Sequence, residues 1–316
     1  MPSNTTPPAN HYVAPIDETP VAAVDSIDES QKARSTWSDA WDAMRKRPMF
    51  WISAVLIVLI VAVAAFPNLF SHTDPARGCL LPDSNGSPEA GHIFGFTRQG
   101  CDVYARVIYG AQASLTVGLL ATVIVTVVGL VIGALAGYYG GLLDAIVSRI
   151  GDIFFAIPTV LGAIVLMSVL PVREPWTVAL VLSAFAWPQV ARITRGAVLS
   201  ARNADYVTAS VALGVSKFRI LVRHVVPNAI TPVIVVATTS LGTFIVAEAT
   251  LSFLGIGLPP NIMSWGNDIG QARVSVATAP MVLFYPAAAL SLTVLSFLML
   301  GDVVRDALDP KARARR

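Results

Sequence analysis

The stretch ADYVTASVALGVSKFRILVRHVVPN, residues Ala204–Asn228, is a polar and basic interruption between two apolar segments of the chain. Asn203 or Asp205 is expected to cap a first short helix, because its side-chain oxygen can accept from the free amides of an opening turn. Gly214 suits the left-handed position that ends such a helix, and Ser216 is placed to begin a second one. The pattern therefore predicts a bent pair of short helices.

The first of these helices is expected to carry an apolar face. Tyr206, Ala209 and Leu213 fall at helical spacing, with Val207 and Val211 beside them. Basic residues follow at Lys217, Arg219 and Arg223. The sequence thus predicts a small apolar knob ringed by positive charge.

The chain as a whole is too apolar for a soluble protein. Of its 316 residues, 54% are hydrophobic and 13% are charged, with a mean hydropathy of +0.65, whereas soluble domains usually carry about a quarter charged residues. Apolar runs near the ~20 residues that a span requires occur at Met49–Phe66, Ala113–Gly137, Ile146–Leu170, Trp176–Ile193, Ala229–Phe253 and Pro280–Leu300. Backbone groups in hydrocarbon must be satisfied internally, so the sequence predicts an all-α integral membrane protein with six spans.

The basic residues predict the orientation of these spans, because positive flanks stay in the cytoplasm. With both termini cytoplasmic, the outer segments hold only five of the 22 Lys and Arg residues, at Arg77, Arg98, Arg106, Arg173 and Arg273. This orientation puts Ala204–Asn228 on the inner side. The net charge of +2 then reflects topology and headgroup contacts, and it does not indicate nucleic-acid binding.

The spans predict how the chain is organised. Residues 1–34 form an acidic arm without apolar periodicity, which is expected to be disordered. Residues 35–48 are expected to form an interfacial helix, with Trp37 and Trp41 at headgroup depth and the Arg45-Lys46-Arg47 run facing anionic lipid. The remaining predicted units are a first span at 49–66, an outer loop at 67–112, a core at 113–303 with short cytoplasmic helices at 204–225, and a cytoplasmic tail at 304–316.

The chain contains two cysteines, Cys79 and Cys101, and both fall in the predicted outer loop. Disulfides persist outside the cytoplasm. The separation of the two cysteines in the sequence permits a disulfide bridge but does not require one. Two unpaired thiols are the alternative.

Thr208-Ala209-Ser210, Gly214 and Val226-Pro227 stand at the spacing of the EAA loop of ABC importer permeases, and the stretch resembles the version of dipeptide and oligopeptide permeases. The resemblance has departures. Thr208 occupies the glutamate position, Ser210 an alanine position, and His224 a position where isoleucine is usual.

Other segments support this resemblance. Residues 100–119, 137–158 and 301–310 are similar to segments of the same family, and LSFLGIGLPP from Leu251 onward matches its most specific signature. The signature residues are Gly255, Gly257, Pro259, Trp265 and Gly266. Because glycine and proline interrupt helices, this part is expected to form an outer loop with a short re-entrant or surface helix, with Trp265 at the outer interface.

The resemblance implies a type I ABC importer in which this chain, similar to the C subunit of the dipeptide system, is one of two non-identical permeases. Its implied partners are a second permease, ATPase subunits that hold ATP and Mg, an extracytoplasmic peptide-binding protein and the lipid bilayer of a prokaryotic cell membrane. The implied cargo is a dipeptide or oligopeptide, with nickel chelates, haem and glutathione as alternatives. The implied ATPase-coupling residues are Asp205, Tyr206, Thr208, Ala209, Ser210, Leu213, Gly214, Lys217 and Phe218.

Charged residues in apolar surroundings are functional candidates. Glu248, with Ser252 one turn later, either lines the translocation path or forms a hydrogen-bonded strut between helices. Asp102 and Arg106 are expected to pair on one helix. Asp144, Arg149 and Asp152 are expected to pair with one another or with the coupling region, and Gly129, Gly133 and Gly137 form a flat strip for packing within the chain or against a partner.

The sequence lacks the motifs of other function classes. No GxxxxGKS or GxxxxGKT loop is present to cradle phosphate, and no HExxH, CxxC or GxSxG occurs. The four histidines form no metal-ligand pattern, so no metal or catalytic residue is predicted. A membrane enzyme is therefore disfavoured, and a channel or membrane scaffold is the alternative from a different class.

Overall fold

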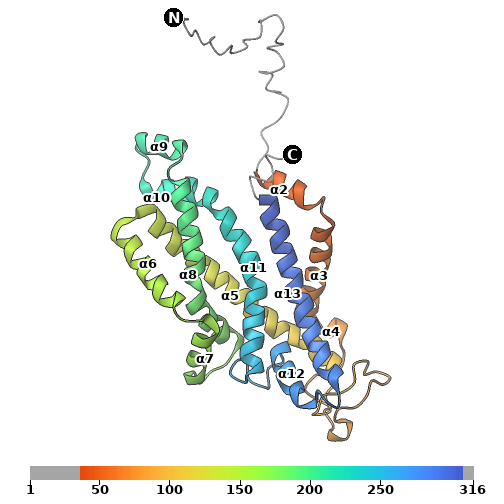
Figure 1. Ribbon diagram of the computed structural model, residues 1–316. Helices are drawn as coiled ribbons and strands as arrows, with labels where there is room; N and C mark the ends of the chain where they lie inside the picture. Colours follow the sequence, from red (N-terminus) through yellow and green to blue (C-terminus); the bar gives the residue numbers. More distant parts are fainter. Residues whose placement is uncertain (1–35, 309–316) are drawn as a thin grey trace, which may run out of the picture.

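The computed structural model describes residues 36–308, and the regular elements in that part of the chain are helices (Figure 1). The all-α prediction is confirmed. The acidic arm predicted at 1–34 lies outside the described residues. Of the tail predicted at 304–316, residues 304–308 continue the last helix and the rest lies outside the described residues.

Five helical stretches of the described chain are long and apolar enough to cross a membrane. They are α3 (Pro48–Ala65), α5 (Val103–Tyr139), α8 (Pro175–Ala201), the stretch Lys217–Phe253 that ends in α11 (Val226–Phe253), and α13 (Pro280–Leu308). Their high apolar content forces backbone groups into internal hydrogen bonds, which is why these runs are helical.

The span predicted at Ile146–Leu170 is not one continuous helix. The chain forms α6 (Gly141–Phe155) and α7 (Thr159–Val169), which are bent by 82° at the break between them. Pro158 lies in this break. Proline lacks an amide hydrogen and disfavours helical geometry in the residue before it, so the helix ends ahead of it. The count of spans reaches six only if this bent pair is taken as one.

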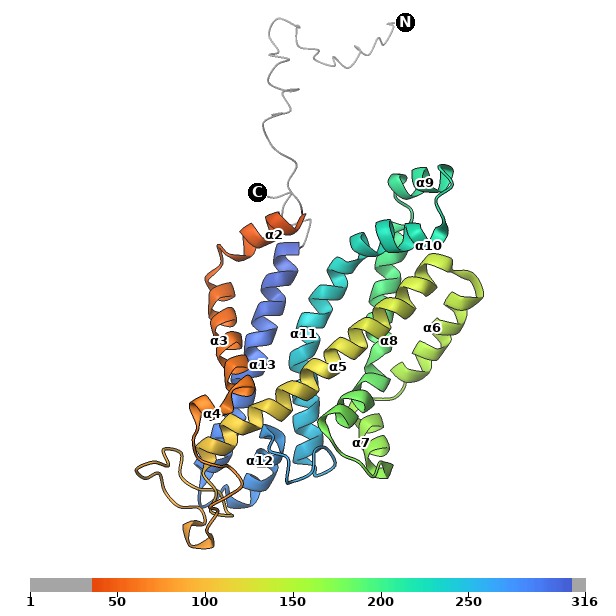
Figure 2. The same ribbon diagram turned by 180° about the vertical axis from the view of Figure 1, so that it is seen from behind.

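The outer loop is shorter than the predicted 67–112, because α5 begins at Val103. Asp102 caps this helix by accepting a hydrogen bond from the Ala105 amide at 2.9 Å. With 37 residues, α5 is roughly 55 Å long at about 1.5 Å per residue, more than the ~30 Å of a hydrocarbon core. It runs obliquely past the other helices, and this slant accommodates its length (Figure 2).

The glycine strip of α5 packs within this chain, against α8. A Cβ at Gly129 would lie 2.6 Å from Val190 Cβ, and one at Gly137 would lie 3.0 Å from the Arg195 carbonyl oxygen. A Cβ at Gly133 would collide with the Ala191 carbonyl oxygen. The missing side chains thus allow the two backbones to approach closely, as expected for small residues spaced by four in membrane helices.

The short helix α2 (Thr36–Met44) packs on the end of α13. Ala40 is 1% exposed and lies in a cluster with Ala307 and Leu308. Trp37 and Trp41 are both 49% exposed, which is compatible with indoles at an interface.

The basic run after α2 is more neutralised than predicted. Arg45 pairs with Asp42 at 2.7 Å, and Arg47 pairs with Asp306 at 2.5 Å. Two of the three cations expected to face lipid therefore bind carboxylates of this chain, because the packing of α2 against α13 brings Asp306 within reach of Arg47.

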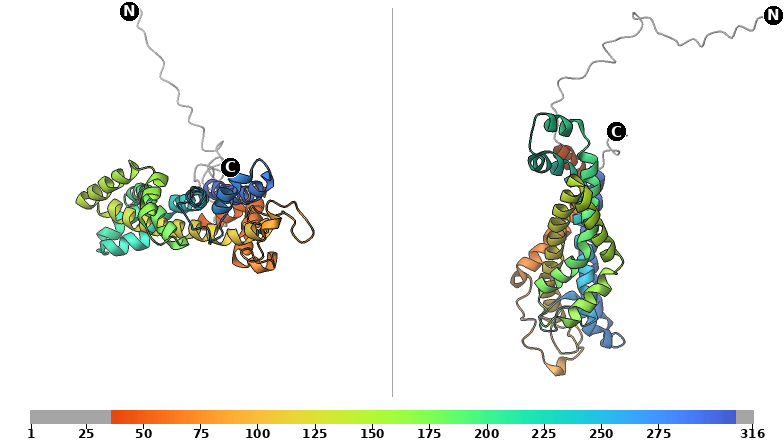
Figure 3. Two further views of the ribbon diagram at one scale, coloured as in Figure 1. Left: turned by 90° about the horizontal axis from the view of Figure 1, so that it is seen from below. Right: turned by 90° about the vertical axis from the view of Figure 1, so that its left-hand side faces the viewer.

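The two ends of the bundle carry different elements. Helix α2, the last turns of α13 and the short helix α9 (Asp205–Ala212) lie at one end, while α12 (Trp265–Ala272) and the loop before α5 lie at the other (Figures 1 and 2). Figure 3 shows that the bundle is broad in one direction and narrow in the perpendicular one. This arrangement agrees with the prediction that the first and the last helical segments of the chain end on the same side of the membrane as Ala204–Asn228.

Candidate functional site

The first candidate site is the short-helix pair α9 and α10 (Lys217–Ile220). The N-cap of α9 is Ala204, and no side chain caps it, so the prediction of a cap by Asn203 or Asp205 is wrong. Asp205 instead lies in the first turn, where its charge interacts favourably with the helix dipole. Ser216 is the N-cap of α10, without a side-chain hydrogen bond.

The turn that ends α9 is a Schellman motif centred on Gly214. The φ angle of Gly214 is +76°, which residues other than glycine rarely adopt. The Val215 amide donates to the Ser210 carbonyl at 3.1 Å, and the Gly214 amide donates to the Val211 carbonyl at 2.9 Å. These are the two bonds that define the motif, and they fix the direction in which the chain leaves α9.

One side of the pair is anchored in the bundle. Val207 is 4% exposed and Ile220 is fully buried. Both belong to an apolar cluster with Val198 at the end of α8 and Val225 before α11. A short π-helical turn, Leu221–Val225, connects α10 to α11. The pair is therefore anchored to the ends of α8 and α11.

The other side of the pair is apolar and exposed. Leu213 is 83% exposed, Phe218 64%, Val211 57% and Tyr206 44%. The predicted coupling residues Asp205, Thr208, Ala209 and Lys217 are also exposed, whereas Ser210 is half-buried and donates a hydrogen bond to the Tyr206 carbonyl at 2.7 Å. Several large apolar side chains are thus exposed together at one end of the bundle, and an exposed apolar patch of this kind is typical of a docking site.

Ion pairs hold α6 against α8 near the same end. Arg195 donates two hydrogen bonds to the carboxylate of Asp144. Asp152 binds Arg192 at 3.1 Å and Arg149 at 3.6 Å. The pairing of Arg149 with Asp152 agrees with the sequence prediction, while the partner of Asp144 is a residue of α8 that the prediction did not name.

Glu248 and Ser252 lie inside the bundle near the end of α11 that packs against α12. Glu248 is fully buried and Ser252 is 2% exposed. The carboxylate of Glu248 accepts hydrogen bonds from Ser114 of α5 at 3.0 Å and from Ser252 at 2.7 Å. Of the two roles considered for Glu248, this arrangement is the one expected of a hydrogen-bonded strut rather than of a group that lines water.

The signature after α11 folds back onto the bundle. Gly255 has a φ of +76°, and a Cβ at Gly257 would lie 2.5 Å from the Ser252 amide nitrogen. A Cβ at Gly266 would lie 2.5 Å from Ala249 Cα. The Pro259 carbonyl accepts a hydrogen bond from the Asn267 side chain at 3.0 Å. Glycine is thus needed where the backbone of the returning segment touches α11.

The prediction that Trp265 lies at the outer interface is wrong. Trp265 is 3% exposed, and its indole Nε1 donates to the Val107 carbonyl of α5 at 2.9 Å. The short helix that it begins, α12, agrees with the prediction of a re-entrant or surface helix. Because α12 packs against both α5 and α11, its first residue is enclosed between them.

The predicted pair between Asp102 and Arg106 does not form. Asp102 caps α5 and its carboxylate contacts the His92 ring. Arg106 binds Asp268 of α12, with its Nε donating to Oδ1 at 2.8 Å. Burial raises the pKa of the Asp268 carboxyl, and the Arg106 guanidinium opposes this rise. No local signal marks this pair in the sequence, since its partners are 162 positions apart.

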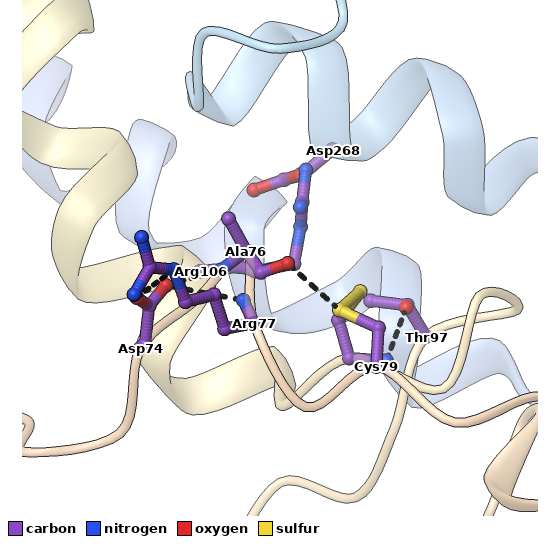
Figure 4. Close-up of a disulfide and its surroundings, with 8 residues drawn as sticks. Asp74, Ala76, Arg77, Cys79, Thr97, Arg106 and Asp268 are labelled. Carbon is purple, nitrogen blue, oxygen red and sulfur yellow. Dashed lines mark hydrogen bonds and ion pairs between the residues drawn. A yellow bond between two sulfur atoms is a disulfide. The ribbon is translucent and has the colours of Figure 1, made fainter.

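Cys79 and Cys101 form a disulfide that closes the outer loop. Figure 4 shows it with Thr97 on one side and the turn at Asp74 on the other. The Thr97 hydroxyl accepts from the Cys101 amide at 3.1 Å, and Asp74 accepts from the Ala76 amide at 2.9 Å. The bridge fixes the loop directly before α5.

Residues 36–308 bring together no three side chains that could hold a metal ion. The exposed apolar side chains of α9 and α10 lie at one end of the bundle, and the disulfide-closed loop and α12 lie at the other (Figure 1).

Comparison with known proteins agrees with these observations. Residues 129–314 match the family described as binding-protein-dependent transport system inner membrane component, and residues 35–85 match the N-terminal TM domain of oligopeptide transport permease C. The chain is 37% identical over 284 residues to the oligopeptide transport system permease protein OppC of Bacillus subtilis (strain 168), covering 90% of this chain and 92% of that protein. It is 36% identical over 282 residues to the glutathione transport system permease protein GsiD of Shigella boydii serotype 4 (strain Sb227), covering 89% and 93%.

Proposed function

Because this chain belongs to the family of binding-protein-dependent transport system inner membrane components, we propose that it is one of two non-identical permease subunits of an ATP-driven peptide importer. It is a multi-pass protein of a bacterial inner membrane and a transport subunit without catalytic activity of its own. Systems of this kind work with ATPases and a substrate-binding protein. In this proposal ATP and Mg bind to the ATPase chains.

The observation that carries the proposal is the exposed apolar surface of α9 and α10, with the Gly214 turn between them. Leu213 and Phe218 are the most exposed large side chains of this surface, at 83% and 64%. Full burial of such a side chain is worth about 1.5–3 kcal/mol. A groove on an ATPase would gain this energy, and the basic residues Lys217 and Arg219 beside it would add charge contacts at the rim.

The anchored side of the pair explains how a partner's motion would reach the membrane. Val207 of α9 packs with Val198 of α8 and Val225 before α11. Packed apolar cores transmit displacement because they have low compressibility. When two ATPases close on ATP, they would therefore move α8 and α11 together with α9. Tilting of the helices against the second permease would then expose the path alternately to each side.

The proposed cargo is a peptide. The relatives named above are a permease for oligopeptides and one for glutathione, and glutathione is itself a small peptide-like molecule with free carboxylates. Dipeptides and longer peptides are the first candidates for this chain, and glutathione is the second. Nickel chelates and haem, which the family resemblance also allowed, have no observation that favours them.

The experiment that tests the proposal is purification and reconstitution of the complex. This chain is tagged and extracted from its own membrane in mild detergent, and the co-purifying chains are identified. We expect a second permease and ATPases, with uptake of labelled peptide into proteoliposomes only when ATP and the binding protein are supplied. Uptake without ATP, or a tagged chain that carries no ATPase, would overturn the proposal. Uptake of glutathione alone would assign the second cargo.

A further inference from the structure

The carboxyl group of Glu248 connects two helices of the bundle through serine hydroxyls. Its Oε2 accepts from Ser114 at 3.0 Å and its Oε1 accepts from Ser252 at 2.7 Å. Ser252 lies one turn further along α11, whereas Ser114 lies on α5, 134 positions away in the chain. The Ser264 hydroxyl, at the start of α12, is a further hydrogen-bond partner of this carboxyl group.

The hydroxyls of Ser114 and Ser252 also bind the segment that returns from the end of α11. The Leu258 amide donates to Ser252 Oγ at 3.1 Å, and the Trp265 amide donates to Ser114 Oγ at 3.3 Å. A serine hydroxyl has one hydrogen and two lone pairs. Because Glu248 takes the hydrogen of each serine, a lone pair of each is left for the backbone amide. A single carboxyl group therefore orients the acceptors of two amides.

The hydrogen-bonded group of Glu248, Ser114, Ser252 and the two backbone amides, here called the relay, is closed to solvent. Glu248 and Ser114 are fully buried, Ser252 is 2% exposed, Leu258 1% and Trp265 3%. Among residues 36–308 no ion pair joins Glu248 to a basic side chain. The carboxyl group is stabilised by the hydroxyls of Ser114 and Ser252 and also by that of Ser264, which caps α12. Buried polar networks of this kind are costly when one member is removed.

We propose that Glu248 is a positioning residue that holds the outer segment, residues 254–264, and α12 in place against α5 and α11. The close backbone contacts at Gly257 and Gly266 place the amides within reach of the serines. The segment and α12 lie at the end of the bundle opposite α9 (Figure 1). Under the proposed function, this end faces the substrate-binding protein, so the relay would preserve the shape of its docking surface.

A cysteine reporter measures the position of the segment without any transport assay. The two native cysteines are joined in a disulfide, so a cysteine introduced at Leu258 is the free thiol of the chain. In native membranes containing the full complex, Leu258→Cys should resist a membrane-impermeant maleimide, because Leu258 is 1% exposed. Asn261→Cys, at an exposed position of the same segment, should label readily in every background.

Loss of the relay should expose Leu258→Cys. Ser252→Ala removes the acceptor of the Leu258 amide. Glu248→Ala removes the carboxyl group that orients the hydroxyls of both Ser252 and Ser114. Each variant should raise the labelling rate of Leu258→Cys roughly tenfold. Ser114→Ala releases only the Trp265 amide and should raise it less. Glu248→Gln retains an acceptor oxygen and should fall between Glu248→Ala and the parent. Ser296→Ala is the matched control, because Ser296 is equally buried but its hydroxyl binds only the Leu292 carbonyl of its own helix.

The result that would overturn the proposal is equal protection of Leu258→Cys in the parent, Ser252→Ala and Glu248→Gln backgrounds, in chains that assemble at normal yield. If Glu248→Ala assembles poorly, the milder Ser252→Ala and Glu248→Gln variants still give the answer. A second readout tests the link to docking. Basal ATP hydrolysis of Ser252→Ala should stay unchanged, while more binding protein should be needed for half-maximal stimulation. Increased labelling without this change would keep the positioning role and reject the docking role.

Discussion

Arg106 at the start of α5 and Asp268 of α12 form a buried ion pair across 162 positions of the chain. Their side chains are 9% and 7% exposed. The guanidinium therefore ties α12 to α5 by charge, beside the indole bond that Trp265 makes to the same helix. A buried charge that loses its partner is strongly unfavourable.

Replacement of Arg106 should destabilise the protein markedly. Arg106→Met leaves the Asp268 carboxylate buried and unpaired, and we expect a loss of about 3–5 kcal/mol in the free energy of unfolding. The loss of stability is measured as a lower melting temperature of the purified complex. Arg98→Met, at an exposed position of the outer loop, is the control and should change little. The double variant Arg106→Met with Asp268→Leu should recover part of the loss, and a single variant that melts like the parent would contradict the prediction.

A charge on the exposed surface of α9 should separate ATP hydrolysis from transport. Leu213→Asp places a carboxylate on the surface proposed to enter the ATPase groove, where central apolar contacts are commonly worth about 2 kcal/mol or more. That loss corresponds to roughly 30-fold weaker docking. Uptake into proteoliposomes should fall while the ATPases remain able to hydrolyse ATP.

The control for this variant is Leu81→Asp. Leu81 is 77% exposed but lies in the loop at the opposite end of the molecule. Its uptake should equal that of the parent. Unchanged uptake by Leu213→Asp would mean that the α9 surface is not the coupling contact.

The left-handed turn after α9 should tolerate asparagine better than valine. At a φ of +76°, a β-branched side chain is strained by about 1–3 kcal/mol, whereas asparagine adopts this region more readily. Gly214→Val should therefore lower both uptake and ATPase co-purification, and Gly214→Asn should retain most of both. Equal behaviour of the two variants would show that the turn geometry is unimportant. Gly196→Ala, where an added Cβ meets nothing within 4 Å, is the control for loss of a glycine.

The packing of α5 on α8 should be sensitive to a single methyl group. Gly133→Ala drives its Cβ into the Ala191 carbonyl oxygen, which cannot move without shifting α8. Overpacking of this kind costs about 1–3 kcal/mol, so the complex should melt at a lower temperature than the parent. Gly196→Ala should melt as the parent does. If Gly133→Ala instead lost only its partner permease with no change in its own stability, the strip would serve contact between subunits.

Much of the fold follows from local patterns in the sequence. The apolar runs required helices, because only internal hydrogen bonds satisfy a backbone in hydrocarbon. The turn at Gly214 was predictable too, since glycine is the residue best suited to a left-handed helix end. The exposed face of Tyr206, Ala209 and Leu213 followed from helical spacing alone.

Other features were set by contacts between distant residues. The partner of Arg106, the burial of Trp265 and the serines around Glu248 depend on how α5, α11 and α12 pack. The sequence by itself determined that the apolar runs are helices and that Ala204–Asn228 forms a bent, partly apolar pair, but not the start of α5 or the break between α6 and α7. Only the tertiary structure decided which polar groups meet inside the bundle. The physical reason is range: hydrogen bonds along a helix join residues four apart, whereas a buried carboxyl or guanidinium is satisfied by whichever donor or acceptor the packing brings within about 3 Å.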